Sequence, residues 1–444
     1  MTGNSFDSIL IDERIRLVTE LTGAFRVPAY LVGGALRDAV MGRPVRDYDF
    51  AIGGAVHELP QEFAARSGGK FFWLDRERQQ SRVVTGKGRE RLTFDFAPLR
   101  GRDIDEDLML RDFTINGMAM ALTCGERLLI DPLGGMTDIR AGMVRLCRRE
   151  AFTDDPLRLL RAFRFAATLG FVVEDGTLEA IKRVPHMLSQ VAGERIRDEI
   201  FLILGATGIG TALKNLLHAG LLAIIIPSDA FKGGAHPGPE ARIDFAADVE
   251  RLAMELDRYF AEDWPLLGDR LQRPLEGDIP VLSLVKLAAL LAGNDPENLI
   301  WSAVMRLRLG NRSWEELRAL CGCAAPLPLP LADGRAERAF YRFFRDREPT
   351  GPELLMLPLA SGLLSPQLAG QLLSFYFHRY RPGEGDLLLN GDEVMELLRI
   401  PQGLELGREM ERLREAESLG LVATAGEARE YLLKKQLTNR EPMG

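Results

Sequence analysis

Two aspartates spaced one residue apart, Asp47 and Asp49, could hold metal ions for chemistry at a phosphate group. They lie in an apolar stretch that closes at Gly53-Gly54, a pattern typical of a β-strand. Because side chains alternate along a strand, both carboxylates should share one face and Tyr48 should point to the other. Two metal ions about 3.5–4 Å apart can activate an attacking hydroxyl and stabilise a leaving pyrophosphate. The alternative is an exposed strand whose aspartates are only solvated.

A glycine turn precedes this acidic pair. The apolar run from Ala29 to Val32 predicts a buried strand, and the residues from Gly34 to Gly42 predict a helix. A glycine pair, Gly33 and Gly34, at such a junction lets main-chain N–H groups approach an anion, and the positive end of the helix dipole favours phosphate. Arg37 could add a charge-assisted contact. A phosphate site beside a metal site indicates nucleotidyl transfer.

A third carboxylate follows in another predicted strand, from Arg91 to Arg100. Alternation places Asp95 on one face, between Phe94 and Phe96, which point to the other. Asp95 is therefore a candidate third metal ligand. The alternative is a position in water at the edge of the sheet.

In this order, the motifs of residues 31–52 resemble the signature of the class II tRNA nucleotidyltransferase and bacterial poly(A) polymerase family, within the polymerase-β-like nucleotidyltransferase superfamily. The resemblance implies an α+β fold, in which an N-terminal palm with a small mixed sheet and helices precedes an all-α C-terminal half. It also implies template-independent addition of C, A or both from CTP and ATP to the 3′ end of tRNA. Mg²⁺ would occupy a two-metal site formed by Asp47, Asp49 and Asp95.

The block from Arg111 to Ala119 resembles the Arg-Arg-Asp-Phe-Thr-Ile-Asn-Ala motif of this family. The resemblance implies that Arg111 and Asp112 contact the triphosphate and ribose of the incoming nucleotide. Leu110 stands where the motif has its first arginine. A structural alternative is a salt bridge between Arg111 and Asp112 that fixes the loop.

A helix is predicted to begin at Asp155, a favourable N-cap, with Pro156 as its first residue. Arg158, Arg161 and Arg164 then form a basic stripe, which could be only a solvated face. The segment resembles the family's Glu-Asp-x-x-Arg motif, which implies that Asp155 and Arg158 read the base. A carboxylate accepts and a guanidinium donates hydrogen bonds, which suits cytosine and adenine and refuses guanine and uracil. All three arginines are candidate nucleotide-binding residues.

The second half of the chain reads as helical, after a linker rich in Gly and Pro from Pro227 to Arg242. Residues 287–294 resemble the metal-binding helix of an HD-type hydrolase, but Ala292 and Gly293 replace the His and Asp, so a degenerate domain is expected. The tail resembles the family's tRNA-binding domain. The expected domains are a catalytic head (1–150), a base-reading neck (151–227), a degenerate HD-like body (242–380) and a tRNA-binding tail (381–444).

Composition limits the remaining possibilities. The net charge of −8 argues against indiscriminate binding of polyanions. The four cysteines have no zinc-type spacing and are expected to be reduced thiols. No apolar run long enough for a membrane span and no secretory signal is found, so a soluble, cytoplasmic protein without membrane contact is expected. Protein partners cannot be read from the sequence.

Three other functions compete. A poly(A) polymerase would share these catalytic motifs, a catalytically inactive RNA-binding protein would not need the aspartates, and transfer to a small molecule would not need the long helical half.

Family members that add all of CCA resemble one another in a flexible insertion between the third-carboxylate strand and the Arg-Asp-Phe-Thr-Ile-Asn block. Here only residues 102–110 connect the two, as in relatives that add only the two cytidines. The sequence thus predicts CC addition.

Overall fold

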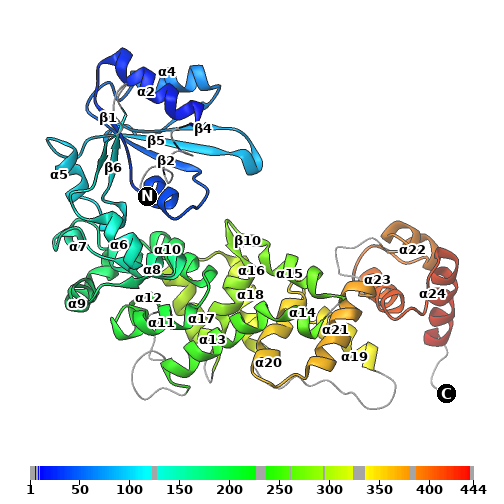
Figure 1. Cartoon of the computed structure of the whole chain (residues 1–444). Helices are drawn as coiled ribbons and strands as arrows, with labels where there is room; N and C mark the ends of the chain where they lie inside the picture. Colours follow the sequence, from blue (N-terminus) through cyan, green and yellow to red (C-terminus); the bar gives the residue numbers. More distant parts are fainter. Residues whose placement is uncertain are drawn as a thin grey trace. The chain divides into compact units, whose positions relative to one another are not determined.

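The computed structural model describes residues 6, 9, 11–122, 128–226, 237–260, 262–293, 296–323, 336–380 and 387–440. Main-chain contacts divide the chain into two compact units. The first contains residues 1–203 and 215–224, and the second contains residues 204–214 and 225–444. Figure 1 labels many of the helices and strands of both units.

A seven-stranded mixed sheet organises the first unit (Figure 1). Its strands, in spatial order, are β3 (Lys70–Asp75), β4 (Gln80–Thr85), β5 (Leu92–Pro98), β2 (Asp47–Ile52), β1 (Ala29–Val32), β6 (Ala119–Ala121) and β7 (Leu129–Ile130). Only the central pair, β2 and β5, is parallel; the other neighbours are antiparallel. The predicted mixed sheet is therefore present.

Aromatic side chains fill one face of this sheet. Phe50 stacks on Phe96, and Tyr48 stacks on Phe94, with ring centroids 4.9 and 5.1 Å apart. Phe63 of α4 (Glu58–Ser67) packs against both strands, so α4 covers this face, with α2 (Glu13–Phe25) beside it (Figure 1). The alternating aspartates of β2 and β5 are left for the opposite face.

The first unit contains further helical segments besides α2 and α4. They are α3 (Gly34–Val40), η1 (Gly88–Glu90), α5 (Ile104–Met109), η2 (Thr114–Asn116), α6 (Gly135–Ala141), α7 (Ala151–Asp154), α8 (Arg158–Leu169), α9 (Asp175–Arg183), η3 (Pro185–Gln190) and α12 (Leu222–Ile225). A small parallel pair joins β8 (Met143–Val144) to β9 (Val172–Val173). Helices α10 (Gly193–Gly205) and α11 (Ile209–His218) each contain residues of both units.

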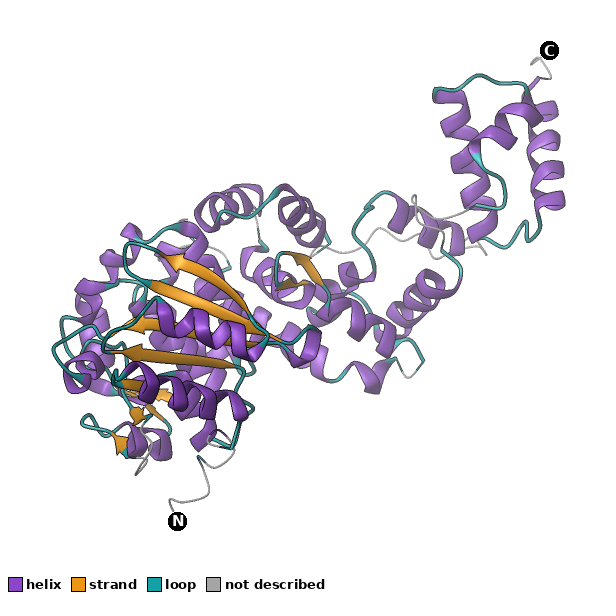
Figure 2. Cartoon of the chain, turned by 90° about the horizontal axis from the view of Figure 1, so that it is seen from above, coloured by secondary structure: helices purple, strands orange, loops and turns teal. Residues whose placement is uncertain are grey.

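The second unit is helical in its described part, apart from the hairpin β10 (Pro274–Glu276) and β11 (Ile279–Pro280), as Figure 2 shows by colour. Its further helices are α13 (Pro239–Met254), α14 (Leu256–Tyr259), α15 (Trp264–Gln272), α16 (Val281–Leu291), α17 (Pro296–Leu307), α18 (Asn311–Gly322), α19 (Ala336–Arg345), η5 (Pro352–Leu355), α20 (Met356–Ala360), α21 (Pro366–His378), α22 (Gly391–Leu398), α23 (Leu404–Ser418) and α24 (Ala425–Arg440). The predicted α+β class is confirmed.

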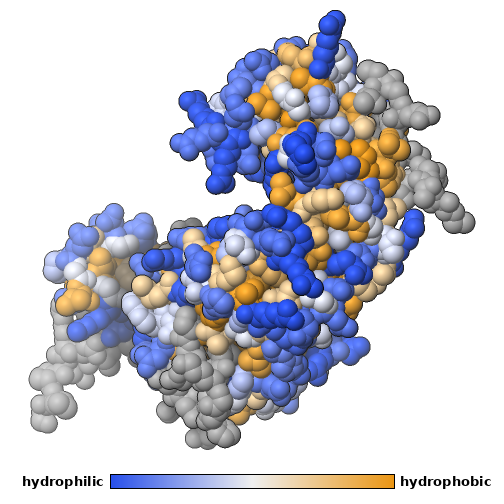
Figure 3. Space-filling model, turned by 90° about the vertical axis from the view of Figure 1, so that its left-hand side faces the viewer, coloured by the Kyte–Doolittle hydropathy of each residue, from blue (hydrophilic) through white to orange (hydrophobic). Residues whose placement is uncertain are grey.

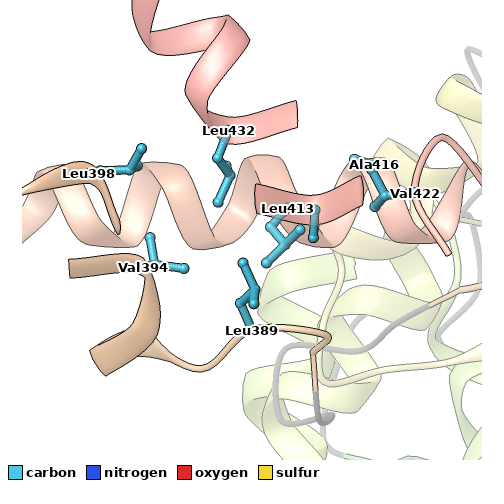
Figure 4. Close-up of a cluster of buried hydrophobic side chains, with 8 residues drawn as sticks. Leu389, Val394, Leu398, Leu413, Ala416, Val422 and Leu432 are labelled. Atoms are coloured by element: carbon cyan, nitrogen blue, oxygen red, sulfur yellow. The ribbon is translucent and has the colours of Figure 1, made fainter. Parts of the chain in front are cut away.

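The last three helices enclose a hydrophobic core of their own (Figure 4). Leu389, Val394 and Leu398 come from α22 and the residues before it, Leu413 from α23, and Leu432 from α24. Asn390 caps α22, and Glu393 completes a capping box. The tail therefore has its own helix start signal and its own buried side chains.

The structure bears on two expectations about the second half of the chain: the segment around Ala292 and Gly293, and the bounds of the linker. Ala292 and Gly293 follow the end of α16, where the buried Arg242 donates hydrogen bonds to the carbonyls of Leu290 and Ala292. The linker was expected to extend to Arg242, but α13 begins at Pro239, and residues 227–236 lie outside the described part.

The cysteines, the apolar character of the helices and the molecular surface bear on the expectations from composition. Cys147, Cys321 and Cys323 are free, and Cys124 lies outside the described residues. Among the helices that the structure describes, none combines the length and apolar character needed to cross a bilayer. Hydrophilic side chains alternate with apolar patches on the face drawn in Figure 3.

Candidate active site

A pocket of about 640 Å³ opens on the face of the sheet opposite α4. Every candidate site residue lines it: Gly33, Gly34, Arg37, Asp47, Asp49, Asp95, Arg111, Asp112, Asp155, Arg158, Arg161 and Arg164. These residues come from strands, turns and helices spread over more than a hundred positions, so the fold collects the predicted motifs into one cavity.

The acidic pair lies on the wall of this pocket. Asp47 is exposed, Asp49 is partly buried, and Tyr48 between them is buried on the aromatic face. In the parallel register Asp49 stands opposite Asp95. The pKa of the Asp49 carboxyl is raised, first by burial and then by the charges of Asp95 and Asp47, while Arg111 and Arg100 oppose the shift. Such a concentration of negative charge favours a cation.

Asp95 differs from this pair because an arginine already holds it. Arg82 of β4 stands opposite Asp95 in the antiparallel register. Its Nε and Nη2 donate to the two Asp95 oxygens, each at 2.7 Å. The alternative that Asp95 lies at the sheet edge is wrong, because β5 lies between β4 and β2.

Asp47 and Asp49 offer negatively charged carboxylate oxygens, which are suitable ligands for a divalent cation. In the described part of the chain no three acidic, histidine or cysteine side chains converge on a common point. Asp95 is turned toward Arg82 instead, so two of the three predicted ligands are available as the side chains stand.

The glycine turn lies directly against the acidic pair. Gly33 has a φ of +75°, which favours glycine, and α3 begins at the next residue. A Cβ at Gly33 would lie 3.3 Å from Asp49 Oδ2 and 3.2 Å from Arg111 Nη1. Arg37 is buried and donates to Asn116 Oδ1 at 2.7 Å while pairing with Asp38. Because Gly33 has no side chain, Asp49 and Arg111 can both approach the turn closely.

Arg111 and Asp112 have separate partners. Arg111 pairs with the buried Asp107 of α5 at 2.9 Å, whereas Asp112 Oδ2 lies 2.9 Å from Arg161 Nη2. The salt bridge between Arg111 and Asp112 that was considered as an alternative is therefore wrong. Although burial opposes ionisation, the pKa of Asp112 is lowered by Arg161, by the Asn116 side chain and by the Phe113 N–H. Asp112 is a fixed, ionised acceptor.

The start of the helix that was predicted to read the base differs from the prediction. α7 ends at Asp154 and α8 begins at Arg158, with Leu157 in the cap position. Asp155 still accepts a hydrogen bond from the Leu157 N–H at 3.2 Å. Its two oxygens also pair with Arg195 of α10, at 3.2 and 2.8 Å. The carboxylate is thus oriented by both its own turn and a neighbouring helix.

The basic stripe of α8 faces the pocket rather than only water. Arg158 is buried and donates to the main-chain carbonyls of Leu110, Arg111 and Ala151. Arg164 pairs with Glu199 at 2.7 Å and stacks on Phe165 at 3.6 Å. Three of the five donor hydrogens of the Arg158 guanidinium are used in this way, which leaves about two for a ligand.

Sequence reasoning missed Arg82, Arg100 and Arg195. Arg100 also lines the pocket. Nothing in the spacing of these arginines marks them, because each is defined by a partner or a cavity formed by distant segments.

Comparison with known proteins agrees with this arrangement. A mixed sheet that carries an acidic pair into an arginine-lined pocket is the arrangement expected of a polymerase-β-like nucleotidyltransferase. Residues 29–145 match the family model "Poly A polymerase head domain", and residues 170–230 match the model "Probable RNA and SrmB- binding site of polymerase A".

Relatives match over almost the whole chain. The CC-adding tRNA nucleotidyltransferase of Geobacter sulfurreducens is 41% identical over 419 residues, which cover 94% of each chain. The A-adding tRNA nucleotidyltransferase of Deinococcus radiodurans is 32% identical, over 91% of this chain and 94% of its own. This chain belongs to the class II tRNA nucleotidyltransferase and poly(A) polymerase family.

Solved structures confirm the fold. The complex of a CCA-adding enzyme with ATP gives a TM-score of 0.70 at 24% identity, over 98% of this chain and 99% of that chain. The Thermotoga maritima CCA-adding enzyme complexed with tRNA gives a TM-score of 0.67 at 24% identity, over 97% and 96%.

Proposed function

We propose that this chain extends the 3′ end of tRNA without a template, and that it adds the two cytidines of the CCA terminus. The observation that carries the proposal is the acidic pair on the wall of a pocket lined by arginines. The curated relatives that match most of the chain support tRNA as the primer, since their names state tRNA nucleotidyltransferase. A poly(A) polymerase is accordingly less favoured.

In the proposed reaction the 3′ hydroxyl of the primer attacks the α-phosphate of CTP. A new P–O bond forms, the bond between the α- and β-phosphates breaks, and pyrophosphate leaves. Asp47 and Asp49 would hold Mg²⁺, which supplies positive charge for activating the hydroxyl and stabilising the leaving group. Arg37 and Arg111 provide positive charge around the glycine turn, where the triphosphate would lie.

Base choice is proposed to depend on Asp155 and Arg158. The Asp155 carboxylate is held by Arg195, so it can present a fixed acceptor to an exocyclic amino group. Arg158 retains donor hydrogens after binding three carbonyls. Asp112, ionised by its basic neighbour, can accept a hydrogen bond from a ribose hydroxyl.

The connection between β5 and the Thr-Ile-Asn block supports CC addition. It forms the short helix α5, capped by Asp103, whose side chain accepts from the Glu106 N–H. Arg102 pairs with Glu106, and the buried Asp107 binds Arg111. A short helix tied at these points offers little chain for a lever that would change the pocket from CTP to ATP. The relative with 41% identity is also CC-adding by name.

We further propose the four-domain division into 1–150, 151–227, 242–380 and 381–444. The family models at 29–145 and 170–230 support the first two domains, and the separate core of the last three helices supports the tail. The tail would bind tRNA.

The test uses labelled CTP or ATP with tRNA ending at the discriminator base, at C or at CC. CTP should be incorporated on the first two substrates, and ATP should not be incorporated on tRNA ending in CC. Efficient ATP incorporation there would refute CC specificity and indicate CCA or A addition. Unlimited ATP addition to arbitrary RNA would indicate a poly(A) polymerase.

A further inference from the structure

The arginines around the pocket differ in how far they are already committed to partners. Most of them have a fixed partner: Arg37 with Asp38 and Asn116, Arg111 with Asp107, Arg158 with main-chain carbonyls, Arg161 with Asp112, and Arg164 with Glu199. These contacts position the guanidinium groups but use part of their charge and hydrogen-bonding capacity. A cation that has no such contact is the stronger candidate for a ligand's negative charge.

Arg100 is that cation. It lines the pocket, is exposed, and its guanidinium makes no hydrogen bond or ion pair within the described ranges of the chain. Its main chain is nevertheless fixed, because its N–H donates to Asp107 Oδ2 at 3.0 Å. The preceding residue, Leu99, donates its N–H to the Ile52 carbonyl at 3.1 Å and so continues the pairing of β5 with β2. An uncommitted side chain thus projects from an anchored main chain.

The charges around Arg100 favour an anion. The pKa of Arg100 is lowered, first by partial loss of water around the group in the pocket and then by the like charge of Arg111. Arg158 adds to this effect, whereas Asp107 and Asp112 oppose it. These three arginines line one pocket, and a multivalent anion bound there would relieve the repulsion among them.

We infer that Arg100 binds the β- and γ-phosphates of the incoming nucleoside triphosphate, an assignment that rests on the proposed function. The acidic pair is the place for the reacting α-phosphate, and the start of α8 is the place for the base. Arg100 follows β5 and lines the same pocket as Arg111, the neighbouring cation that is proposed to meet the triphosphate. A guanidinium can bind phosphate oxygens in a bidentate manner, and it would stabilise the charge that develops on the leaving pyrophosphate.

The test compares ligands that contain and lack these phosphates. Affinities for CTP, CMP, inorganic pyrophosphate and tRNA are measured by calorimetry for the wild-type chain, Arg100→Ala and Arg100→Lys. Arg91→Ala is the matched control, because Arg91 is exposed at the opposite end of β5 and does not line the pocket. Loss of one charge-assisted contact should weaken CTP and pyrophosphate binding by about tenfold or more in Arg100→Ala. CMP affinity should stay within about twofold, Arg100→Lys should be intermediate, and Arg91→Ala should match the wild type.

Other outcomes overturn the inference. Equal losses for CTP and CMP would mean that Arg100 only shapes the pocket. Unchanged CTP affinity together with weaker tRNA binding would assign Arg100 to the primer's phosphates. If the wild-type chain itself binds neither CTP nor ATP, the proposed function fails as well, whereas CTP binding that is equal in the wild type and Arg100→Ala refutes the inference alone.

Discussion

The clearest consequence of the acidic pair is a conflict between stability and catalysis at Asp49. Its carboxyl group is partly buried and stands opposite Asp95, with Asp47 two residues earlier; these surroundings raise its pKa, and Arg111 opposes the shift. Like charges opposite each other on neighbouring strands cost roughly 0.2–1 kcal/mol, and burial of the charge adds to that cost. We therefore expect Asp49→Asn, which keeps the shape, to stabilise the metal-free protein by about 1 kcal/mol.

The assay is thermal unfolding with EDTA and with Mg²⁺, followed by transfer of labelled CMP to tRNA. In EDTA the melting midpoint of Asp49→Asn should exceed that of the wild type by roughly 2–4 °C, the shift for about 1 kcal/mol in a unit of this size. Mg²⁺ should reverse the order, because a cation that binds only the folded state stabilises it by about 2.7 kcal/mol at a hundred times its dissociation constant. Transfer should be abolished in the variant.

The control is Asp105→Asn, at an exposed position of α5 that does not line the pocket. Its midpoint should respond to Mg²⁺ as the wild type does. A lower midpoint for Asp49→Asn in EDTA, or an equal Mg²⁺ response in all three proteins, would refute the assignment of Asp49 to a metal site.

Three further predictions address the neck, the glycine turn and the helical unit. Arg195→Ala should cost less than about 1 kcal/mol in unfolding free energy, because the pair with Asp155 is half exposed on the arginine side. Selectivity for CTP over UTP should nevertheless fall, because Arg195 orients the Asp155 carboxylate. Unchanged nucleotide ranking in transfer assays would contradict this positioning role. Gly33→Ala should lower the free energy of unfolding by about 1–2 kcal/mol, because Gly33 has a positive φ. It should also reduce kcat/KM, because the added Cβ would crowd Asp49 and Arg111. Kinetics equal to the wild type would contradict the close packing of the turn. Burial and the neighbouring Glu353 raise the pKa of Glu316 to about 8, so its contribution to stability is complete below its ordinary value of 4.5 and is lost as pH rises to about 8. Melting midpoints between pH 5 and 9 should fall more steeply in the wild type than in Glu316→Gln, and parallel curves would refute the shift.

Local patterns in the sequence were sufficient for the elements that carry the chemistry. The strand from Ala29 to Val32 and the helix after Gly33 were predicted because apolar periodicity and glycine positions act over a few residues. The alternation around Asp49 and Asp95 likewise predicted which side chains share a face. The resemblance then placed these elements in a family, which comparison with relatives confirmed.

The start of α8, the helix proposed to read the base, shows where local rules end. Asp155 and Pro156 favour a helix start, yet α8 begins at Arg158. Asp155 instead receives Arg195, which lies forty residues later in the chain. A pairing partner on another helix competes with the capping position, and such a partner cannot be recognised from neighbouring residues.

The acidic pair, the glycine turn and the basic stripe could all be predicted from the amino-acid sequence, because each depends on spacing within one element. The pairing of charges, in contrast, depends on the folded arrangement of distant segments. Arg82 reaches Asp95 through the register of β4 and β5, and Arg161 reaches Asp112 through the packing of α8 against the loop before η2. Among the residues that the structure describes, the same packing gives the Arg100 side chain no ion-pair partner and leaves it on the pocket wall. Charge pairing depends on distances across the fold, and the closing of the sheet and helices sets these distances.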